Sequence, residues 1–305
     1  MNIHVIIDFM HIYYKYFYQL KAGRLHRLSA EVNGVERDTT LLYYPLKDIE
    51  KIRKQLEDIG HDVTISICFD SKSKRNEENA EYKANRTTSL LDADFANVDK
   101  IREILTDAGY NTYKIEGYEA DDLVNKLIKQ YKDDFDFTVI YTNDKDIFVN
   151  ICDNVGVMRF KTGKGYQRVD KTNYESFLEN EFNVFIPYNT LGLFLATAGD
   201  SADNIKGITK FGPKAFGKLI TKVASKYSIE FGNCGDYSEL RKVKELCREF
   251  LTESQYAELE TSFELVANTK FDGDLDKPTS AGSIDEAVAK REAAYGKYNM
   301  NSLIY

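Results

Sequence analysis

Three segments of the chain share a pattern that narrows the fold: each is rich in β-branched residues and each runs into an aspartate. Their ranges and final aspartates are 3–8 with Asp8, 63–70 with Asp70, and 137–144 with Asp144. Apolar residues at helical spacing occupy residues 46–59 and 98–108, between these segments. Strands that alternate with helices predict a parallel sheet. Because ligands of such sheets bind beyond the carboxyl ends of the strands, we expect the three aspartates to meet at one edge of an α/β sheet.

Further acidic residues lie at a predicted helix start and in a predicted loop. Glu119, Asp121 and Asp122 open a predicted helix over 123–131, and Asp200 and Asp203 lie in a turn-rich break after a predicted helix over 191–198. Taken singly, each acid has an ordinary structural explanation, as a turn residue or a residue at the positive end of a helix. Several carboxylates that converge must share protons or bind cations. An all-oxygen ligand set predicts Mg²⁺ or Mn²⁺ rather than zinc, and two such ions suit phosphodiester hydrolysis.

The net charge of −8 would ordinarily argue against a nucleic-acid partner. The distribution of charge changes that interpretation, because residues 204–229 contain no Asp or Glu and carry a lysine at every fourth position. These lysines are Lys206, Lys210, Lys214, Lys218, Lys222 and Lys226. The acidic total therefore does not exclude DNA.

Other features bound the class of protein. No run of about twenty apolar residues is present, and residues 1–9 are too short and too acidic for a secretory signal, so we expect a cytoplasmic protein without a membrane span. The four cysteines, which show no CxxC spacing, are expected to be reduced and structural. They are Cys68, Cys152, Cys234 and Cys247.

Five segments, in their order along the chain, carry a resemblance to a known family. They are Val5-Ile6-Ile7-Asp8; Phe69-Asp70 with Arg75 and residues 82–86; Gly117-Tyr118-Glu119-Ala120-Asp121-Asp122; Asp144-Lys145-Asp146; and residues 199–207. The chain resembles, over roughly residues 1–225, the 5′-nucleases: flap endonucleases, phage 5′-exonucleases and the amino-terminal nuclease domain of bacterial DNA polymerase I.

The resemblance implies a fold and a set of metal ligands. The fold would be α/β, a PIN-like, mostly parallel central sheet flanked by helices, with a helical helix-hairpin-helix region. The nuclease domain would span 1–190, with a helical arch at about 72–97, and the helix-hairpin-helix and C-terminal helices would span 191–305. One ion would be held by Asp8, Asp70, Glu119, Asp121 and Asp122, and a second by Asp144, Asp146, Asp200 and Asp203.

The same resemblance implies residues that contact the substrate. Lys83 and Arg86 would stabilise charge in the transition state, and Tyr14 would stack on a base near the scissile phosphate. The expected DNA-binding residues are Tyr14, Arg75, Lys206, Gly207, Lys210, Gly212, Lys214 and Lys218. The chain departs from the family where Lys210 and Phe211 replace the usual Gly and Ile, which bears on a potassium ion expected at the hairpin, and where Asn143 replaces a Gly.

We therefore expect a monomeric, two-Mg²⁺ nuclease, with Mn²⁺ as a substitute, that acts at 5′ ends, nicks or flaps of DNA. Its activities would include 5′–3′ exonuclease, flap endonuclease and RNase H action on RNA primers in RNA–DNA hybrids, in replication or repair beside other replication proteins. The size is that of bacteriophage enzymes, which would place it in the host cytoplasm. Two alternatives stay open: a non-catalytic protein that binds DNA junctions, and a PIN-type RNase.

Overall fold

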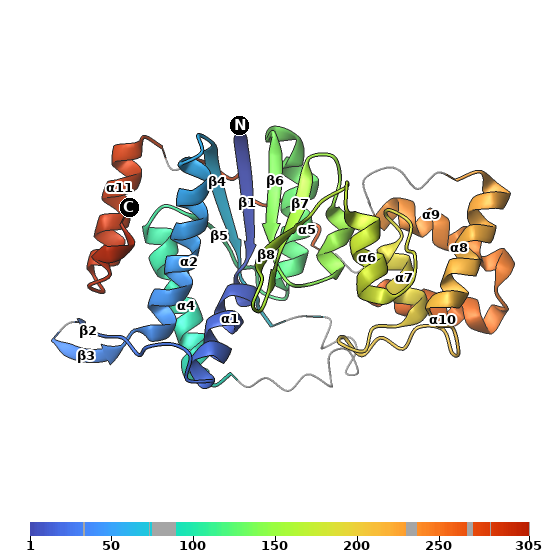
Figure 1. Cartoon of the computed structure of the whole chain (residues 1–305), viewed down its shortest axis with the longest axis horizontal. Coiled ribbons are helices and arrows are strands. Elements are labelled where there is room, and N and C mark those ends of the chain that lie inside the picture. The colour runs from blue at the N-terminus through green and yellow to red at the C-terminus, as the bar shows by residue number, and fades with distance from the viewer. Residues whose placement is uncertain are drawn as a thin grey trace. The chain divides into compact units, whose positions relative to one another are not determined.

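The structure is a computed structural model that describes residues 1–32, 34–72, 74, 90–229, 237–266, 271–280 and 282–304, without the side chains of 237 and 238. The chain divides into two compact units (Figure 1). The first unit contains residues 1–72, 88–142 and 272–305, and the second contains 73–87 and 143–271.

Strands of the first unit confirm the predicted mostly parallel sheet. They are β1 (Asn2–Asp8), β4 (Asp62–Cys68), β5 (Asn111–Tyr113) and β6 (Phe137–Tyr141), with a separate hairpin of β2 (Ser29–Val32) and β3 (Val35–Asp38). In the described residues the main-sheet strands of this unit have the order β5-β4-β1-β6 and run parallel. Asp8 is opposite Cys68, and Ile7 is opposite Tyr141. The predicted strand ends therefore share one edge.

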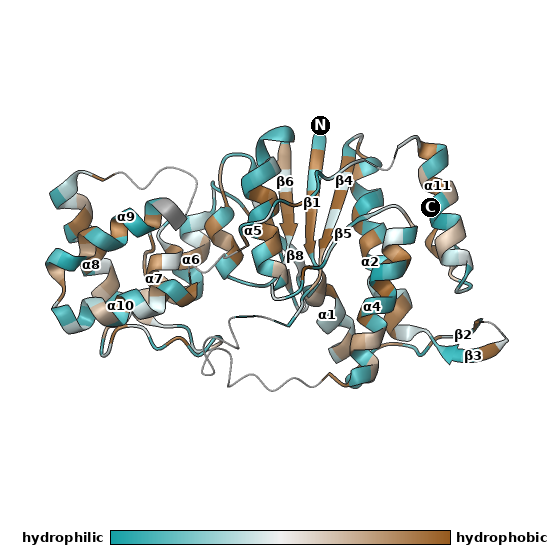
Figure 2. Ribbon diagram, turned by 180° about the vertical axis from the view of Figure 1, so that it is seen from behind, coloured by the Kyte–Doolittle hydropathy of each residue, from teal (hydrophilic) through white to brown (hydrophobic). Residues whose placement is uncertain are grey.

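The central strand β1 is a continuous apolar run because both of its faces are covered. Val5, Ile6 and Ile7 have no exposed surface, and Figure 2 shows the strands of this unit mostly in the colour of hydrophobic residues. His4 keeps one polar contact in this core, since its Nε2 lies 2.8 Å from Ser66 Oγ. Burial lowers the pKa of His4 to about 3, so the ring is neutral near pH 7.

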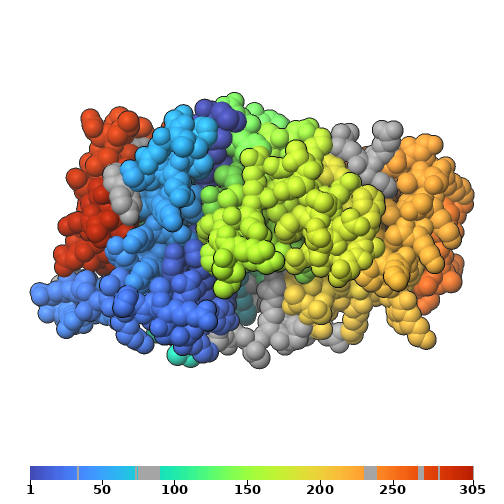
Figure 3. All heavy atoms as spheres, in the orientation of Figure 1, coloured from blue at the N-terminus to red at the C-terminus, as the bar shows by residue number. Residues whose placement is uncertain are grey.

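Helices flank the sheet of the first unit. Their bounds are α1 (Phe9–Lys21), α2 (Thr40–Glu57), α4 (Asp92–Asp107), α5 (Ala120–Tyr131) and α11 (Ile284–Gly296), with short 3₁₀ helices η1 (Lys132–Asp134) and η4 (Asn301–Leu303). Helix α2 begins six residues before the predicted start at 46, although Pro45 lies inside it. Helix α5 packs on β1 and β4, and α11 packs on α4. The C-terminal segment, red in Figure 3, thus completes the unit that contains the N-terminus.

Helices predominate in the second unit. Its elements are η2 (Asp146–Asn150), β7 (Val155–Lys161), β8 (Gly165–Val169), α6 (Tyr174–Phe182), α7 (Leu191–Ala198), α8 (Pro213–Tyr227), α9 (Tyr237–Cys247), η3 (Arg248–Phe250) and α10 (Glu253–Val266). Strands β7 and β8 form an antiparallel hairpin. Helix α7, almost entirely apolar, is buried and contacts α8, α10 and η2. It serves as the core of this unit.

Packing divides the chain differently from the expected boundary at residue 190. The second unit begins before the β7–β8 hairpin, and the C-terminal 34 residues of the chain belong to the first unit. The expected boundary separates a nuclease domain from a DNA-binding region, and it stays a prediction. Cys68, Cys152 and Cys247 are buried free thiols, and Cys234 lies outside the described residues. No helix in the described ranges is long and apolar enough to cross a membrane.

Candidate metal centre and nucleic-acid interface

The first acidic cluster lies at the start of α5, in the first unit. Carboxylate oxygens of Glu119, Asp121 and Asp122 all lie within 4.8 Å of one another. The backbone folds them together, because Glu119 is the residue before the helix and its amide donates to Asp122 Oδ2 at 3.0 Å. The positive end of the helix dipole lowers the cost of gathering three negative charges here. The sequence-predicted trio is therefore one cluster.

Asp70 and Asp8 are placed by the ends of β4 and β1. Asp70 Oδ1 accepts a hydrogen bond of 2.7 Å from the amide of Ala120, in the first turn of α5, so Asp70 lies beside the first cluster. Asp8 Oδ2 accepts from the buried hydroxyl of Thr142 at 2.9 Å. Burial, and then the nearby charges of Asp8 and Asp70, raise the pKa of the Cys68 thiol well above its ordinary value. Cys68 is thus a neutral wall of the site.

The second acidic cluster lies in the second unit. Carboxylate oxygens of Asp146, Asp200 and Asp203 fall within 4.8 Å of one another, and Asp200 and Asp203 are each 5% exposed. A tight turn positions the last two, since the backbones of Asp200 and Ile205 exchange two hydrogen bonds of 2.8 Å. Asp144 lies outside the trio but accepts from the amide of Asp146 at 3.0 Å.

Gly207 holds this turn closed. Its φ is +66°, and a Cβ on it would lie 2.4 Å from the backbone nitrogen of Gly199 and 2.7 Å from the carbonyl oxygen of Thr197. Both contacts are to backbone, which cannot move aside cheaply, so only glycine fits. The sequence interpretation assigned Gly207 to DNA; the structure adds a second role, which is to set the turn that carries Asp200 and Asp203.

Charges in the second cluster are only partly balanced. The Nζ of Lys145 is 2.6 Å from Asp200 Oδ2. Burial works to lower the pKa of Lys145, but Asp146, Asp200 and Asp144 raise it above its usual value. Burial, followed by the charge of Asp144, raises the pKa of Asp146 well above the ordinary carboxyl range. Asp146 Oδ1 is buried with no hydrogen-bond partner among the described residues, as expected for an oxygen that waits for a cation.

Within the described part of the chain, Lys145 is a candidate site residue that the sequence interpretation missed. It was quoted within Asp144-Lys145-Asp146 but given no role. The signal that could have identified it is a lysine between two acids that both follow a strand. The short spacing keeps its ammonium group near the carboxylates. In this structure it supplies the positive charge that the acid trio requires.

Tyr14 lies on the less buried side of α1. Its ring stacks on that of Tyr18, with 5.9 Å between centroids and 18° between planes, and Tyr18 is 54% exposed. The neighbouring Tyr13, by contrast, is fully buried and donates to Asp94 at 3.1 Å. Of these two tyrosines, Tyr14 is the one that a base could reach, and its role in stacking stays a prediction.

The predicted hairpin precedes and includes α8. Gly212 is the residue before α8 and Pro213 is its first residue, as the sequence suggested for a turn that opens a helix. Exposed lysines line one side of α8, opposite the buried Phe216 and Ile220; they are Lys214, Lys218, Lys222 and Lys226. In the preceding loop Lys206 and Lys210 are exposed and Gly207 is buried.

Two contacts of that loop bear on binding. Lys210, at the position where the family usually has glycine, adopts a φ of +60°, a conformation that disfavours a residue with a side chain. The amide and hydroxyl of Thr209 donate to Glu258 on α10, at 2.8 and 2.9 Å. A carboxylate therefore occupies donors that a phosphate oxygen could accept from.

The expected arch is mostly outside the described residues, and so are the three basic residues assigned to it. These are Arg75, Lys83 and Arg86. Residues 92–97, which the expected range included, form the start of α4.

Comparison with known proteins agrees with the acidic clusters described above. The family described as "5'-3' exonuclease, N-terminal resolvase-like domain" matches residues 4–180. A 5'-3' exonuclease of Buchnera aphidicola (subsp. Acyrthosiphon pisum) is 30% identical over 212 residues, which are 67% of this chain and 65% of that protein. A DNA polymerase I of Caldicellulosiruptor bescii is 30% identical over 205 residues, 67% of this chain but 23% of the polymerase. The match thus spans less than two thirds of either relative.

Solved structures agree on the fold. A structure titled as divalent zinc ions bound to T5 5'-exonuclease has a TM-score of 0.56 and 16% identity, covering 97% of this chain and all of the other. The bacteriophage T5 flap endonuclease in a pseudo-enzyme-product complex with DNA and metal ions has a TM-score of 0.54 and 16% identity, over 98% and 100%.

Fold, acidic clusters and sequence match together define the class as that of the 5′-nucleases. The chain belongs to the 5'-3' exonuclease family, through its N-terminal resolvase-like domain.

Proposed function

We propose that the chain is a divalent-metal-dependent 5′-nuclease that hydrolyses phosphodiesters at 5′ ends, nicks or flaps of DNA. The observation that carries the proposal is the pair of oxygen-only acidic clusters, one at the start of α5 and one formed by Asp146, Asp200 and Asp203. All nine acids of the family pattern are present in the chain. A non-catalytic relative would have no use for so many carboxylates in this pattern.

The residues of each cluster suit Mg²⁺, with Mn²⁺ as a substitute, because every ligand is a carboxylate oxygen. The first ion would bind Asp8, Asp70, Glu119, Asp121 and Asp122; the second would bind Asp144, Asp146, Asp200 and Asp203. The unpartnered, buried Oδ1 of Asp146 and the ammonium of Lys145 against Asp200 both fit a site that requires positive charge. When bound, such ions lower the pKa of an attacking water and offset charge on the leaving oxygen.

The chain's own groups prepare these ligands. Thr142 and the amide of Ala120 fix Asp8 and Asp70 by donating to one oxygen of each. The ammonium group of Lys145, which pairs with Asp200, would reduce the repulsion among the carboxylates of the second cluster when no metal is bound. Lys83 and Arg86 are proposed to stabilise the charge that develops on the phosphate.

Duplex DNA would bind along the basic face of α8 and its preceding loop. The proposed contacts are Lys206, Gly207, Lys210, Gly212, Lys214 and Lys218, with Arg75 in the arch and Tyr14 stacking on a base. The exposed lysines of α8 support this assignment. The T5 flap endonuclease complex with DNA and metal ions supports DNA as the ligand. A potassium ion at the loop belongs to the proposal as well.

Wider aspects of the proposal follow from the family. The nuclease domain would end near residue 190, and the DNA-binding helical region would follow. RNA primers in RNA–DNA hybrids would be cut in addition to DNA, in replication or repair. The protein would act as a monomer, alongside replication proteins, in the cytoplasm, which is that of the bacterial host if a phage encodes it.

Cleavage of 5′-labelled substrates tests the proposal. A flapped DNA, an RNA–DNA duplex and a single-stranded RNA would each be incubated with and without Mg²⁺. We expect metal-dependent cleavage of the flap, lost in Asp146→Asn and strongly reduced in Lys83→Ala. Cleavage that needs no metal, or none at all by the unmutated protein, would refute the nuclease assignment. Binding without cutting would favour a junction-binding protein, and cutting of single-stranded RNA alone would favour a PIN-type RNase.

Binding is tested separately from turnover. Asp70→Asn should keep DNA affinity and lose turnover, whereas Lys214→Ala should weaken duplex binding and reduce its dependence on salt. Lys164→Ala removes an exposed lysine from the β7–β8 turn and serves as the control. Equal affinity and salt dependence for Lys214→Ala and the unmutated protein would rule out the hairpin contact.

A further inference from the structure

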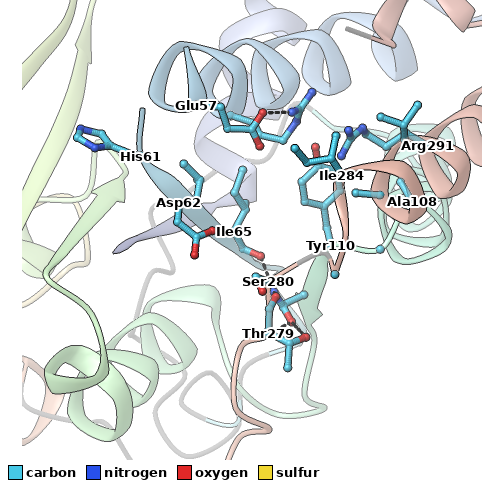
Figure 4. A pocket seen from close by; sticks show the side chains of 17 residues that line it. Glu57, His61, Asp62, Ile65, Ala108, Tyr110, Thr279, Ser280, Ile284 and Arg291 are labelled. Atoms are coloured by element: carbon cyan, nitrogen blue, oxygen red, sulfur yellow. Dashed lines mark hydrogen bonds and ion pairs between the residues drawn. The ribbon is translucent and has the colours of Figure 1, made fainter. Parts of the chain in front are cut away.

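A cavity of about 460 Å³ lies within the first unit, at the opposite end of β4 from Asp70. It is lined by the end of α2, the start of β4, the connection from α4 to β5, and residues of the segment 279–291 (Figure 4). Strand β4 runs from Asp62 at the cavity to Cys68, a length of about 20 Å. The cavity is therefore separate from the acidic cluster at α5. Its volume is within the range of small-molecule sites, roughly 300–1,000 Å³.

Arg291 brings a buried guanidinium into this cavity that makes no direct ion pair within the described residues. Its side chain is 5% exposed, and its Nε is buried without a hydrogen-bond partner among the described residues. No ion pair of Arg291 is found among those residues either. Figure 4 shows Arg291 reaching from α11 toward Tyr110 and Glu57, but Glu57 is ion-paired with Arg53. A buried guanidinium with an unsatisfied Nε and no direct ion pair is unfavourable, and an anion that binds to it would relieve that cost.

Arg53, on the wall of the same cavity, is ion-paired, although its Nη2 has no hydrogen-bond partner within the described part of the chain. Its Nε donates to Glu50 Oε2 at 2.9 Å. Glu50 has no exposed surface, and its other oxygen accepts from the hydroxyls of Tyr110, at 2.6 Å, and Tyr295, at 2.5 Å. The carboxylate of Glu50 is thus fully used. Arg53 pairs with Glu57 as well, so Arg291 is the guanidinium of this cavity that has no ion pair among the described residues.

The rest of the lining suits the apolar part of an organic ligand. Apolar side chains form much of the wall; they are Val63, Ile65, Ala108, Ile284, Ala287 and Val288. Ser280 adds an exposed hydroxyl at the rim, and Asp62 adds an exposed carboxylate there that would oppose an anion. Apolar walls around one unpaired guanidinium resemble the usual make-up of a ligand site, in which a few polar groups fix the orientation.

We infer that this cavity binds a small organic anion, whose carboxylate or phosphate pairs with Arg291 and whose apolar or aromatic part packs against the walls. The ligand would connect α11 to α2, β4 and the α4–β5 connection. This site is independent of the proposed nuclease activity, because none of its lining residues is a proposed metal ligand or DNA contact.

Calorimetric titration of the full chain in EDTA tests the inference. Adenosine 5′-monophosphate, benzoate and inorganic phosphate are the anionic probes, and adenosine is the neutral control. We expect one equivalent of adenosine 5′-monophosphate or benzoate to bind, at least tenfold more weakly in Arg291→Gln and more tightly in Asp62→Asn. The exposed Arg37→Gln should match the unmutated protein. The preferred probe distinguishes a phosphate from a carboxylate ligand.

Stability without ligand provides a second measurement. Arg291→Met should raise the melting temperature of the ligand-free protein, because it removes an unpaired buried charge. Arg53→Met should lower it, because it leaves Glu50 without its partner. The inference is overturned if no anionic probe binds, if Arg291→Gln binds as the unmutated protein does, or if Arg291→Met lowers the melting temperature as Arg53→Met does.

Discussion

Replacing Asp146 by asparagine should make the metal-free protein more stable while it removes the response to metal. The change keeps the size of the side chain and deletes one charge from a trio whose oxygens lie within 4.8 Å. At that separation, two full charges repel by about 3–4 kcal/mol at an effective dielectric constant of about 20. Lys145, which is paired with Asp200, offsets part of this repulsion.

Protonation of Asp146 limits how much stability the Asp146→Asn substitution can add. The pKa of Asp146 is raised, so the carboxyl can take up a proton rather than remain charged. At pH 7 that costs about 4 kcal/mol, since each pH unit above an ordinary carboxyl pKa of about 3.9 costs about 1.4 kcal/mol. After the contribution of Lys145 is subtracted, we expect Asp146→Asn to raise the free energy of unfolding by about 1–3 kcal/mol in EDTA. The melting temperature should then rise by about 2–8 °C.

Metal should reverse that order. The unmutated protein gains about 2.7 kcal/mol when free Mg²⁺ reaches one hundred times its dissociation constant, whereas a variant that lacks a ligand gains less. Thermal unfolding followed by circular dichroism, in EDTA and across an Mg²⁺ series, measures both effects. Asp153→Asn, at a carboxylate 84% exposed in the same unit, is the control and should follow the unmutated protein. The reasoning fails if Asp146→Asn is the less stable protein in EDTA, or if it gains as much from Mg²⁺.

Three further predictions concern single positions. Lys210→Gly should raise the free energy of unfolding by about 0.5–1 kcal/mol, because glycine adopts the positive φ without strain; a decrease in denaturant unfolding would contradict this. Glu258→Gln should increase duplex affinity several-fold in fluorescence anisotropy, since it removes a negative charge from the donors of Thr209, and unchanged affinity would argue against the loop as a contact. The pKa of His4 is lowered to about 3 in the folded state, so the unfolded state binds more protons and stability falls as the pH drops from about 6.5 toward 3. His4→Gln should reduce proton uptake on unfolding in that window by about one proton, and an unchanged slope would contradict a neutral buried ring.

Local patterns in the sequence determined much of the fold. The strands predicted at 3–8, 63–70 and 137–144 are β1, β4 and β6, and the helix predicted at 191–198 is α7 with the same bounds. Hydrophobic spacing and helix-start residues act over a few positions, so a sequence states them directly. The acidic trio at the start of α5 could be predicted for the same reason, because Glu119 and Asp122 are close in sequence and the amide of Glu119 donates to Asp122.

Contacts between distant parts of the chain were decided only by the tertiary structure. Lys145 contacts Asp200, 55 residues away, because of how the chain folds rather than because of any local pattern. The contact of Gly207 with Gly199 lies within one turn, but the folded turn is what requires a glycine there.

The return of α11 to the first unit is the longest of these connections, since Tyr295 binds Glu50 across 245 residues. The sequence determined which carboxylates are available to a metal. The tertiary structure decided which of them meet, and it alone buries the Nε of Arg291 without a hydrogen-bond partner among the residues that the structure describes. The physical reason is that burial and pairing depend on which surfaces pack together, whereas secondary structure depends mainly on neighbours in the sequence.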